Sequence, residues 1–164
     1  MSFLLRLFFG RAPRATLIRV GILVAVSVVV FGWILMPVRT QGISMLPLYE
    51  TDGLHFFNRL TYAWREPRRG DIVAIQVGAG EVVYVKRIVG LPGERVRIEA
   101  GNVVVNGQPV DEPYVRYRTH GWDLEEIALG PDEFFVVGDN RSMRIEQHTL
   151  GLVHRRRIVG TMAW

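Results

Sequence analysis

The longest apolar stretch of the chain lies near its N-terminus. The nineteen residues from Val20 to Val38 carry no charge and include a single serine. A helix of this length, rising about 1.5 Å per residue, crosses a hydrocarbon core of roughly 30 Å. Trp33 lies near the far end of the run, where an indole suits the headgroup region. The pattern predicts one transmembrane helix, which we place at residues 17–38.

The residues after the apolar run argue against a cleaved signal peptide. A signal peptide has a shorter apolar region of about 7–15 residues, followed by a small-residue cleavage site. Pro37–Gln41 contains no such site, so we expect an uncleaved anchor in the lipid bilayer. Four arginines precede the run and only Arg39 follows it closely. The positive-inside bias therefore predicts a single-pass protein of the cell membrane, with residues 1–16 in the cytoplasm and residues 39–164 on the outer face.

Beyond the anchor, the hydrophobic pattern changes to short runs rich in Val, Ile, Phe and Tyr, which are bounded by turn-forming residues and are typical of strands. Ala100-Gly101 between two runs is a hairpin signal. Helical periodicity is weak after residue 50, except for a turn near Tyr62–Arg65. We expect a mainly β fold, an antiparallel β-rich domain preceded by one transmembrane helix. The expected strands are Leu54–Asn58, Asp71–Val77, Glu81–Val89, Arg95–Glu99, Asn102–Val105, Phe134–Val137 and Arg157–Met162.

Composition excludes several classes of protein. The 164 residues include no cysteine, which excludes disulfides, thiolate metal sites and a cysteine nucleophile. The net charge of +4 comes from the first forty residues, which hold five arginines and no acid. The remainder is nearly neutral, so we expect no nucleic-acid partner. The histidines and carboxylates show no ligand spacing, so we expect no metal and no cofactor. Nothing in the sequence indicates an oligomeric state.

Lysine is nearly absent from the chain, which has nineteen arginines and one lysine, Lys86. An arginine stays protonated in a protein, whereas a lysine in an apolar pocket can lose its proton. Lys86 lies in the apolar run Val82–Val89. A lone lysine is most simply an ordinary surface charge, but burial among valines would lower its pKa from about 10.4 and make its amine a base.

Ser44 is a matching candidate nucleophile. It follows the apolar run closely, and Met45–Pro47 give it an apolar neighbourhood. A serine hydroxyl is a poor nucleophile until a base removes its proton. No G-x-S-x-G elbow is present, so a Ser-His-Asp triad is only an alternative to a Ser/Lys dyad, which needs no third carboxylate. The histidines, which we interpret as ordinary surface or strand residues, are His55, His120, His148 and His154.

These residues fall into a pattern that resembles type I signal peptidases. Gly42-x-Ser44-Met45-x-Pro47 is similar to the nucleophile box of that family, and Lys86–Glu94 is similar to its base box almost residue for residue. The matching segments occur in the family's order over about residues 18–160. The others are Arg69–Val73, Asn106-Gly107, Glu112–Tyr114 and Gly138–Arg141.

The resemblance implies a membrane-bound serine endopeptidase with Ser44 as the nucleophile and Lys86 as the general base. Its substrates would be exported preproteins with small residues before the cleavage site, bound in an extended form against a strand edge. The backbone N–H of Ser44 would hold part of the oxyanion. Some members of the family add a serine hydroxyl where this chain has Gly42. We expect activity to rise with pH as Lys86 deprotonates.

The last matching segment departs from the family pattern. The residues expected to support the site from this segment are Gly138, Asp139, Asn140, Arg141, Arg144 and Glu146. Gly138 and Asn140 would shape a turn near the lysine, and the acids and Arg141 would be supporting charges. Arg144 stands where the family has a serine that hydrogen-bonds the lysine amine, and an arginine cannot accept that bond. If Arg144 faces Lys86, its charge would favour the neutral amine, or its bulk would crowd the site.

Two alternatives to an active peptidase remain open. Arg144 favours a catalytically weakened paralogue that acts as a binding or scaffold component of an export complex. A self-cleaving regulator of the related Ser/Lys type is a lower-ranked alternative, because such proteins usually carry a DNA-binding module where this chain has an anchor.

Several apolar residues are expected near the bilayer because they lie close to the anchor in the sequence. They either enter the lipid or belong to the core of the domain. They are Met45, Leu46, Phe56 and Phe57.

Overall fold

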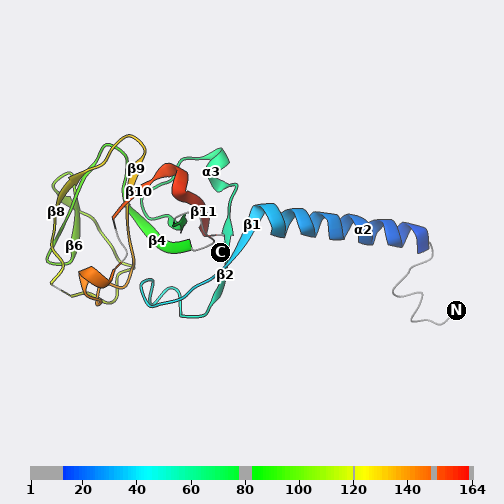
Figure 1. Ribbon diagram of the computed structural model, residues 1–164, viewed down its shortest axis with the longest axis horizontal. Helices are drawn as coiled ribbons and strands as arrows, with labels where there is room; N and C mark the ends of the chain where they lie inside the picture. Colours follow the sequence, from blue (N-terminus) through cyan, green and yellow to red (C-terminus); the bar gives the residue numbers. More distant parts are fainter. Residues whose placement is uncertain (1–12, 78–82, 120, 149–150, 163–164) are drawn as a thin grey trace.

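A long apolar helix projects from a β domain in the computed structural model, which describes residues 13–77, 83–119, 121–148 and 151–162 (Figure 1). Helix α2 covers Pro13–Val29 and continues as a π-helical turn over Val30–Ile34. Its apolar side chains are exposed, Leu23 by 65% and Trp33 by 76%. A helix that is apolar and has no buried residue in its apolar window needs an apolar solvent. Its length and composition suit a membrane anchor.

The helix ends earlier than the sequence pattern suggests. The expected span runs to Val38, but Leu35–Arg39 form strand β1, so the helix end is corrected to Ile34. Pro37 is the physical reason, because proline lacks an N–H and disfavours helical backbone at the residue before it. Strand β1 pairs antiparallel with β2, Leu54–Asn58. The N–H of Arg59 donates to the carbonyl of Ile34 at 2.9 Å and ties the domain to the end of the helix.

The larger of two antiparallel sheets has seven strands in the order β1-β2-β11-β3-β4-β9-β10. Strand β4 lies inside this sheet between β3 and β9, and Lys86 on β4 lies opposite Val73 on β3. The strands of this sheet other than β1 and β2 are β3 (Ile72–Gln76), β4 (Val83–Gly90), β9 (Glu133–Val137), β10 (Gly151–His154) and β11 (Ile158–Met162).

The smaller sheet has four strands in the order β7-β6-β5-β8 and lies at the end of the domain away from α2 (Figure 1). Its β5–β6 hairpin turns at Ala100 and Gly101, which both have positive φ, as the sequence signal predicts. Its strands are β5 (Arg95–Glu99), β6 (Asn102–Val105), β7 (Gln108–Pro109) and β8 (Leu124–Ala128). The short helical turns of the domain are α3 (Thr61–Trp64), η2 (Ile145–Gln147) and η3 (Arg155–Arg157).

The mainly β fold expected from the sequence is confirmed, and six expected strands match the observed bounds to within one residue at each end. Residues 78–82 lie outside the described residues, and so does the expected start of β4 at Glu81. The pattern misses β1, which lies inside the predicted anchor, and the short strands β7, β8 and β10. Strand β8 reads LEEIA and shows only half-buried and exposed side chains, so its sequence has no apolar run to detect.

Strand β4 contributes a side chain to each of three core clusters. Val89 packs in the cluster between β5, β6 and β9, Ile88 packs against β3, β9 and β11, and Val85 packs beneath the β1–β2 connection. Met45 and Phe57 belong to the third cluster and are 4% and 0% exposed. For these two residues the core interpretation is therefore correct and the lipid interpretation is wrong.

A buried ion pair joins two segments that are distant in the sequence. Arg141, in the turn after β9, donates to the Glu112 carboxylate at 2.6 Å through Nη2, and its Nε donates to the carbonyl of Gly138 at 2.7 Å. The side chains of Arg141 and Glu112 are 0% and 1% exposed. The Trp122 ring lies 5.8 Å from the guanidinium carbon. Because both side chains are buried, water cannot replace either partner, and each charge is stabilised by the other.

We predict that Glu112→Ala lowers the free energy of unfolding by about 3–5 kcal/mol, because it leaves the Arg141 guanidinium buried without its carboxylate. The matched control is Glu126→Ala, which removes a partly exposed acid paired with Arg95, and its cost should be about 1 kcal/mol or less. Urea unfolding of the detergent-solubilised chain measures both. Equal costs for the two variants would contradict this account of the buried pair.

Candidate active site

Lys86 is buried because β4 is an internal strand of the sheet and the residue opposite it is apolar. The side chain is 4% exposed and lies opposite Val73, which is fully buried. Burial lowers the pKa of Lys86 from 10.5 to about 8, against a smaller effect of the Asp139 carboxylate, which raises it. An ammonium loses hydration in such surroundings, so the neutral amine becomes accessible at moderately alkaline pH.

Ser44 lies in the connection between β1 and β2. The Thr40 hydroxyl donates to the carbonyl of Glu50 at 2.9 Å, and the N–H of Asp52 donates to the Thr40 carbonyl at 2.7 Å, so the connection closes on itself. Directly after Ser44, the side chains of Met45 and Tyr49 are buried in the third core cluster. These two anchors hold the short segment that carries the serine against the sheet.

The turn after β9 holds the backbone around Ser44. The N–H of Asn140 donates to the Ser44 carbonyl at 3.0 Å, and the Asn140 side-chain amide donates to the Ile43 carbonyl at 3.0 Å. A Cβ on Gly138 would lie 2.2 Å from the Ser44 carbonyl oxygen and 2.5 Å from Cε1 of His148. Only glycine allows the turn to approach this closely. Gly138 and Asn140 therefore hold the backbone on which Ser44 lies: Gly138 allows the close approach, and Asn140 makes the hydrogen bonds.

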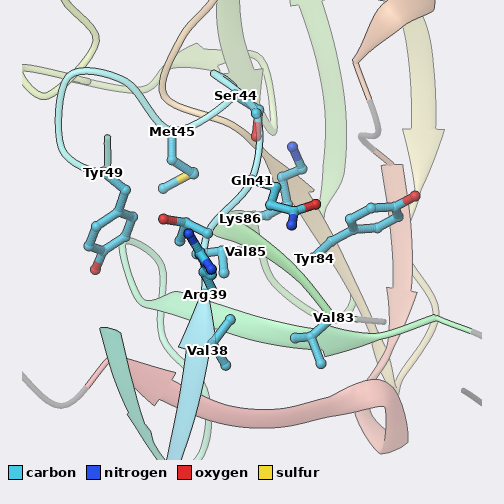
Figure 2. A pocket seen from close by; sticks show the side chains of 12 residues that line it. Val38, Arg39, Gln41, Ser44, Met45, Tyr49, Val83, Tyr84, Val85 and Lys86 are labelled. Atoms are coloured by element: carbon cyan, nitrogen blue, oxygen red, sulfur yellow. The ribbon is translucent and has the colours of Figure 1, made fainter. Parts of the chain in front are cut away.

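The Ser44 hydroxyl and the Lys86 side chain line the same cleft (Figure 2). Among the described residues, neither the Ser44 hydroxyl nor the Lys86 amine makes a hydrogen bond with another group. The cleft runs between the end of β1 with the residues after it and the first half of β4. The other residues lining it are Val38, Arg39, Thr40, Gln41, Gly42, Met45, Tyr49, Val83, Tyr84 and Val85.

A second buried ion pair lies beside Lys86. Arg87 donates to Asp139 through Nε at 2.8 Å, and its Nη1 donates to the carbonyl of Gly70 at 2.8 Å. The Tyr114 ring lies 3.8 Å from the Arg87 guanidinium carbon. The Asp139 side chain is only 1% exposed. Asp139 is therefore a buried charge that fixes the turn after β9 against β4.

The structure does not bring Arg144 and Glu146 to the site. Their side chains are 78% and 67% exposed and pair with each other at 3.4 Å. The expectation that Arg144 acts on the Lys86 amine, by charge or by crowding, is corrected, because its guanidinium is in solvent. Among the described residues, the exposed Glu146 pairs only with Arg144, so it does not hold the turn after β9.

His148 is buried beside the site, so its interpretation as a surface or strand residue is wrong. It is 7% exposed, its Nε2 lies 2.8 Å from the Asn140 carbonyl, and its ring packs edge-on against Trp122 at 4.7 Å. Burial, followed by the nearby charge of Lys86, lowers the pKa of His148 to about 4. The sequence pattern gave it no role, because its buried place depends on the turn over η2. Of the other three, His120 lies outside the described residues.

No group of three or more histidine and acidic side chains within the described ranges could hold a metal ion.

Comparison with known proteins shows the family of the chain. The family described as signal peptidase, peptidase S26, matches residues 14–164. The chain belongs to this family. The resemblance expected from the sequence motifs is thereby confirmed.

Individual relatives differ in how much of them the chain covers. It is 35% identical to signal peptidase I of Leptolyngbya laminosa over 71% of this chain, which is 61% of that protein. It is 34% identical to signal peptidase I S of Bacillus subtilis over 85% of this chain and 81% of the relative. A crystal structure of a signal peptidase I from Enterococcus faecalis superposes with a TM-score of 0.49 at 24% identity, over 59% of this chain and 97% of the other.

We predict that Gly138→Ala destabilises the domain by about 1–3 kcal/mol, because its methyl group overlaps backbone atoms of Ser44 that cannot move away cheaply. Gly121→Ala is the matched control, since its methyl group would meet only the Thr119 hydroxyl at 4.0 Å, and it should change stability by less than about 0.5 kcal/mol. Thermal unfolding of both variants measures the difference. A tolerated alanine at position 138 would show that the turn does not hold Ser44 as described.

Proposed function

We propose that the chain is a membrane-anchored serine endopeptidase that removes signal peptides from exported preproteins. Membership of the peptidase S26 family supports the reaction class. The observation that carries the assignment of residues is the shared cleft of Ser44 and Lys86, in which the amine is buried and its pKa is lowered to about 8.

In the proposed reaction, the neutral Lys86 amine takes the proton from the Ser44 hydroxyl as its oxygen attacks the scissile carbonyl carbon. The tetrahedral intermediate collapses, the C–N bond breaks, and the Lys86 ammonium returns the proton to the leaving amine. Water, deprotonated by Lys86, then attacks the acyl-serine ester. The C–O bond to Ser44 breaks, the Lys86 ammonium returns the proton to the Ser44 oxygen, and the second product leaves as the acid. A lysine can serve as the base in this sequence because it needs no third group to select a ring tautomer.

The developing oxyanion has one backbone donor close to the nucleophile. The N–H of Ser44 donates no hydrogen bond among the described residues, so it is available to a substrate oxygen. Gly42, two residues earlier, has no hydroxyl, and its φ of 88° is suited to glycine. In this proposal the Ser44 N–H carries the oxyanion contact on this side of the cleft.

The cleft suits an extended peptide that comes from the membrane side. One wall is the end of β1, which follows directly from the helix, and the other is β4. A substrate whose signal sequence lies in the same bilayer would reach the cleft without leaving the membrane surface. We propose small residues before the cleavage site, residues 1–16 in the cytoplasm and the domain on the outer face of the cell membrane, in accord with the arginine distribution.

The weakened-paralogue alternative loses its main support in this geometry. It rests on Arg144 in place of a family serine, and Arg144 points into solvent. Restoring that serine by Arg144→Ser should leave the cleavage rate within about twofold, since an exposed side chain is removed. An inactive parent chain that Arg144→Ser rescues would favour the alternative.

We predict that Ser44→Ala and Lys86→Met each reduce cleavage of a generic preprotein by at least about a thousandfold, because each removes one half of the dyad. Ser27→Ala, in the exposed helix, is the matched control and should retain full activity. Cleavage by the parent chain should rise with pH and level off above pH 8, because only the neutral amine accepts the serine proton. Retained cleavage in either dyad variant, or a flat rate from pH 6 to about pH 10, would contradict the assignment.

Orientation is testable because the chain has no cysteine, so an introduced cysteine is the only thiol. We predict that Gln108→Cys, on the exposed strand β7, reacts with a membrane-impermeant maleimide added outside intact cells. Ser2→Cys should react only after the membrane is permeabilised. The reverse pattern would mean that the domain is cytoplasmic.

A further inference from the structure

The imidazole of His148 has an unused acceptor, and its ring lies with the Ser44 carbonyl around the same Gly138 backbone. Its Nε2 lies 2.8 Å from the Asn140 carbonyl, and a carbonyl oxygen can only accept a hydrogen bond. Nε2 must therefore carry the proton. In a neutral ring this leaves Nδ1 as a bare acceptor, and Nδ1 is buried and has no hydrogen-bond partner among the described residues.

The Lys86 amine has the complementary need. A neutral amine keeps its lone pair for the Ser44 proton and must direct its two N–H groups elsewhere, yet it donates to no described side chain or backbone carbonyl. An amine that turns freely in the cleft loses the orientation that proton transfer requires. A buried acceptor near Lys86 would remove that freedom.

We propose that His148 is the positioning residue for Lys86: its Nδ1 accepts a hydrogen bond from the amine and aims the nitrogen lone pair at Ser44. This inference rests on the proposed function. His148 would do here what a serine does in the family pattern at the position held by Arg144, whose side chain lies in solvent. The imidazole reaches the site from four residues further along the chain because η2 turns the backbone inward.

The surroundings of His148 keep the imidazole in the form that accepts. The groups that bear on its titration are Lys86 and Arg141, both of which disfavour a positive imidazole, together with the Asn140 carbonyl. Trp122 closes one edge of the ring, and the Gly138 backbone lies against Cε1. The pKa of about 4 means that the ring stays neutral at any pH where Lys86 can act as a base.

Two substitutions separate positioning from packing. His148→Gln places an amide N–H where Nε2 lies, so it keeps the bond to Asn140 but loses the acceptor at Nδ1. His148→Asn places an amide oxygen near Nδ1, so it keeps the acceptor but loses the bond to Asn140. If His148 positions Lys86, the asparagine variant should be the more active, whereas a purely structural histidine would favour the glutamine variant.

We expect His148→Gln to lower kcat for preprotein cleavage about tenfold with KM unchanged within about twofold, since one hydrogen bond in the reacting site is lost. His148→Asn should stay within about threefold of the parent. In the glutamine variant the rising limb of the pH–rate profile should also move to lower pH, because the ammonium form loses an acceptor that stabilised it. The proposal would be overturned if the two variants had equal kcat values or if the glutamine variant were the more active. It would also be overturned if the rising limb of the glutamine variant's pH–rate profile moved to higher pH.

Two measurements without turnover keep this inference separate from the proposed function. Because the chain has one lysine, lysine-selective ¹⁵N labelling yields a single side-chain amine resonance, and its midpoint should fall in His148→Gln. Histidine-selective ¹⁵N labelling of the parent should show the Nε2–H tautomer at His148, even if the variants fold poorly. An Nδ1–H tautomer, or an unchanged lysine midpoint, would overturn the proposal whatever the activity. If the parent chain shows no cleavage that depends on Ser44, the proposed function is contradicted, but the hydrogen bond between His148 and Lys86 is not.

Discussion

The Lys86 amine belongs to β4, the strand whose side chains reach all three core clusters, and the packing around this residue leaves it only 4% exposed. Desolvation costs the ammonium form its hydration, and this cost moves the pKa to about 8. Every other feature of the site is arranged around that amine. An internal strand is a suitable carrier because its backbone is fixed on both sides, so the amine cannot escape to solvent by a small backbone shift.

The turn after β9 is the second fixed element, and two buried arginines hold it. Asp139 pairs with Arg87 from β4, and Arg141 pairs with Glu112 from the segment after β7. Buried pairs of this kind add little net stability, but breaking one is costly, so they select one arrangement of the turn. That arrangement places Asn140 on the backbone of Ser44. The buried pairs thus fix where the serine stands relative to the lysine, which is the quantity that proton transfer depends on.

The sequence predicts the fold well, and the two residues that it proposes as central, Ser44 and Lys86, line one cleft. The reasons are local. Runs of β-branched residues between turn residues give β5 and β6 their observed bounds, and an aromatic run does so for β2. The short spacing of the motif around Ser44 indicates the serine. What it could not predict depends on distant residues. The Arg87–Asp139 pair joins positions 52 residues apart, and the buried histidine depends on how η2 turns the chain. Aligning residues without gaps pointed to Arg144, but the fold exposes that side chain and buries His148, four residues later.

The central claim is that residue 86 is a desolvated amine, and its acid–base equilibrium tests this claim most directly. With ¹⁵N-lysine in the folded, detergent-solubilised chain, one amine resonance is expected, since the chain holds one lysine. Following that resonance with pH should give a midpoint near 8 in the parent. A midpoint near 10.5, the value of an ordinary exposed lysine, would contradict the account.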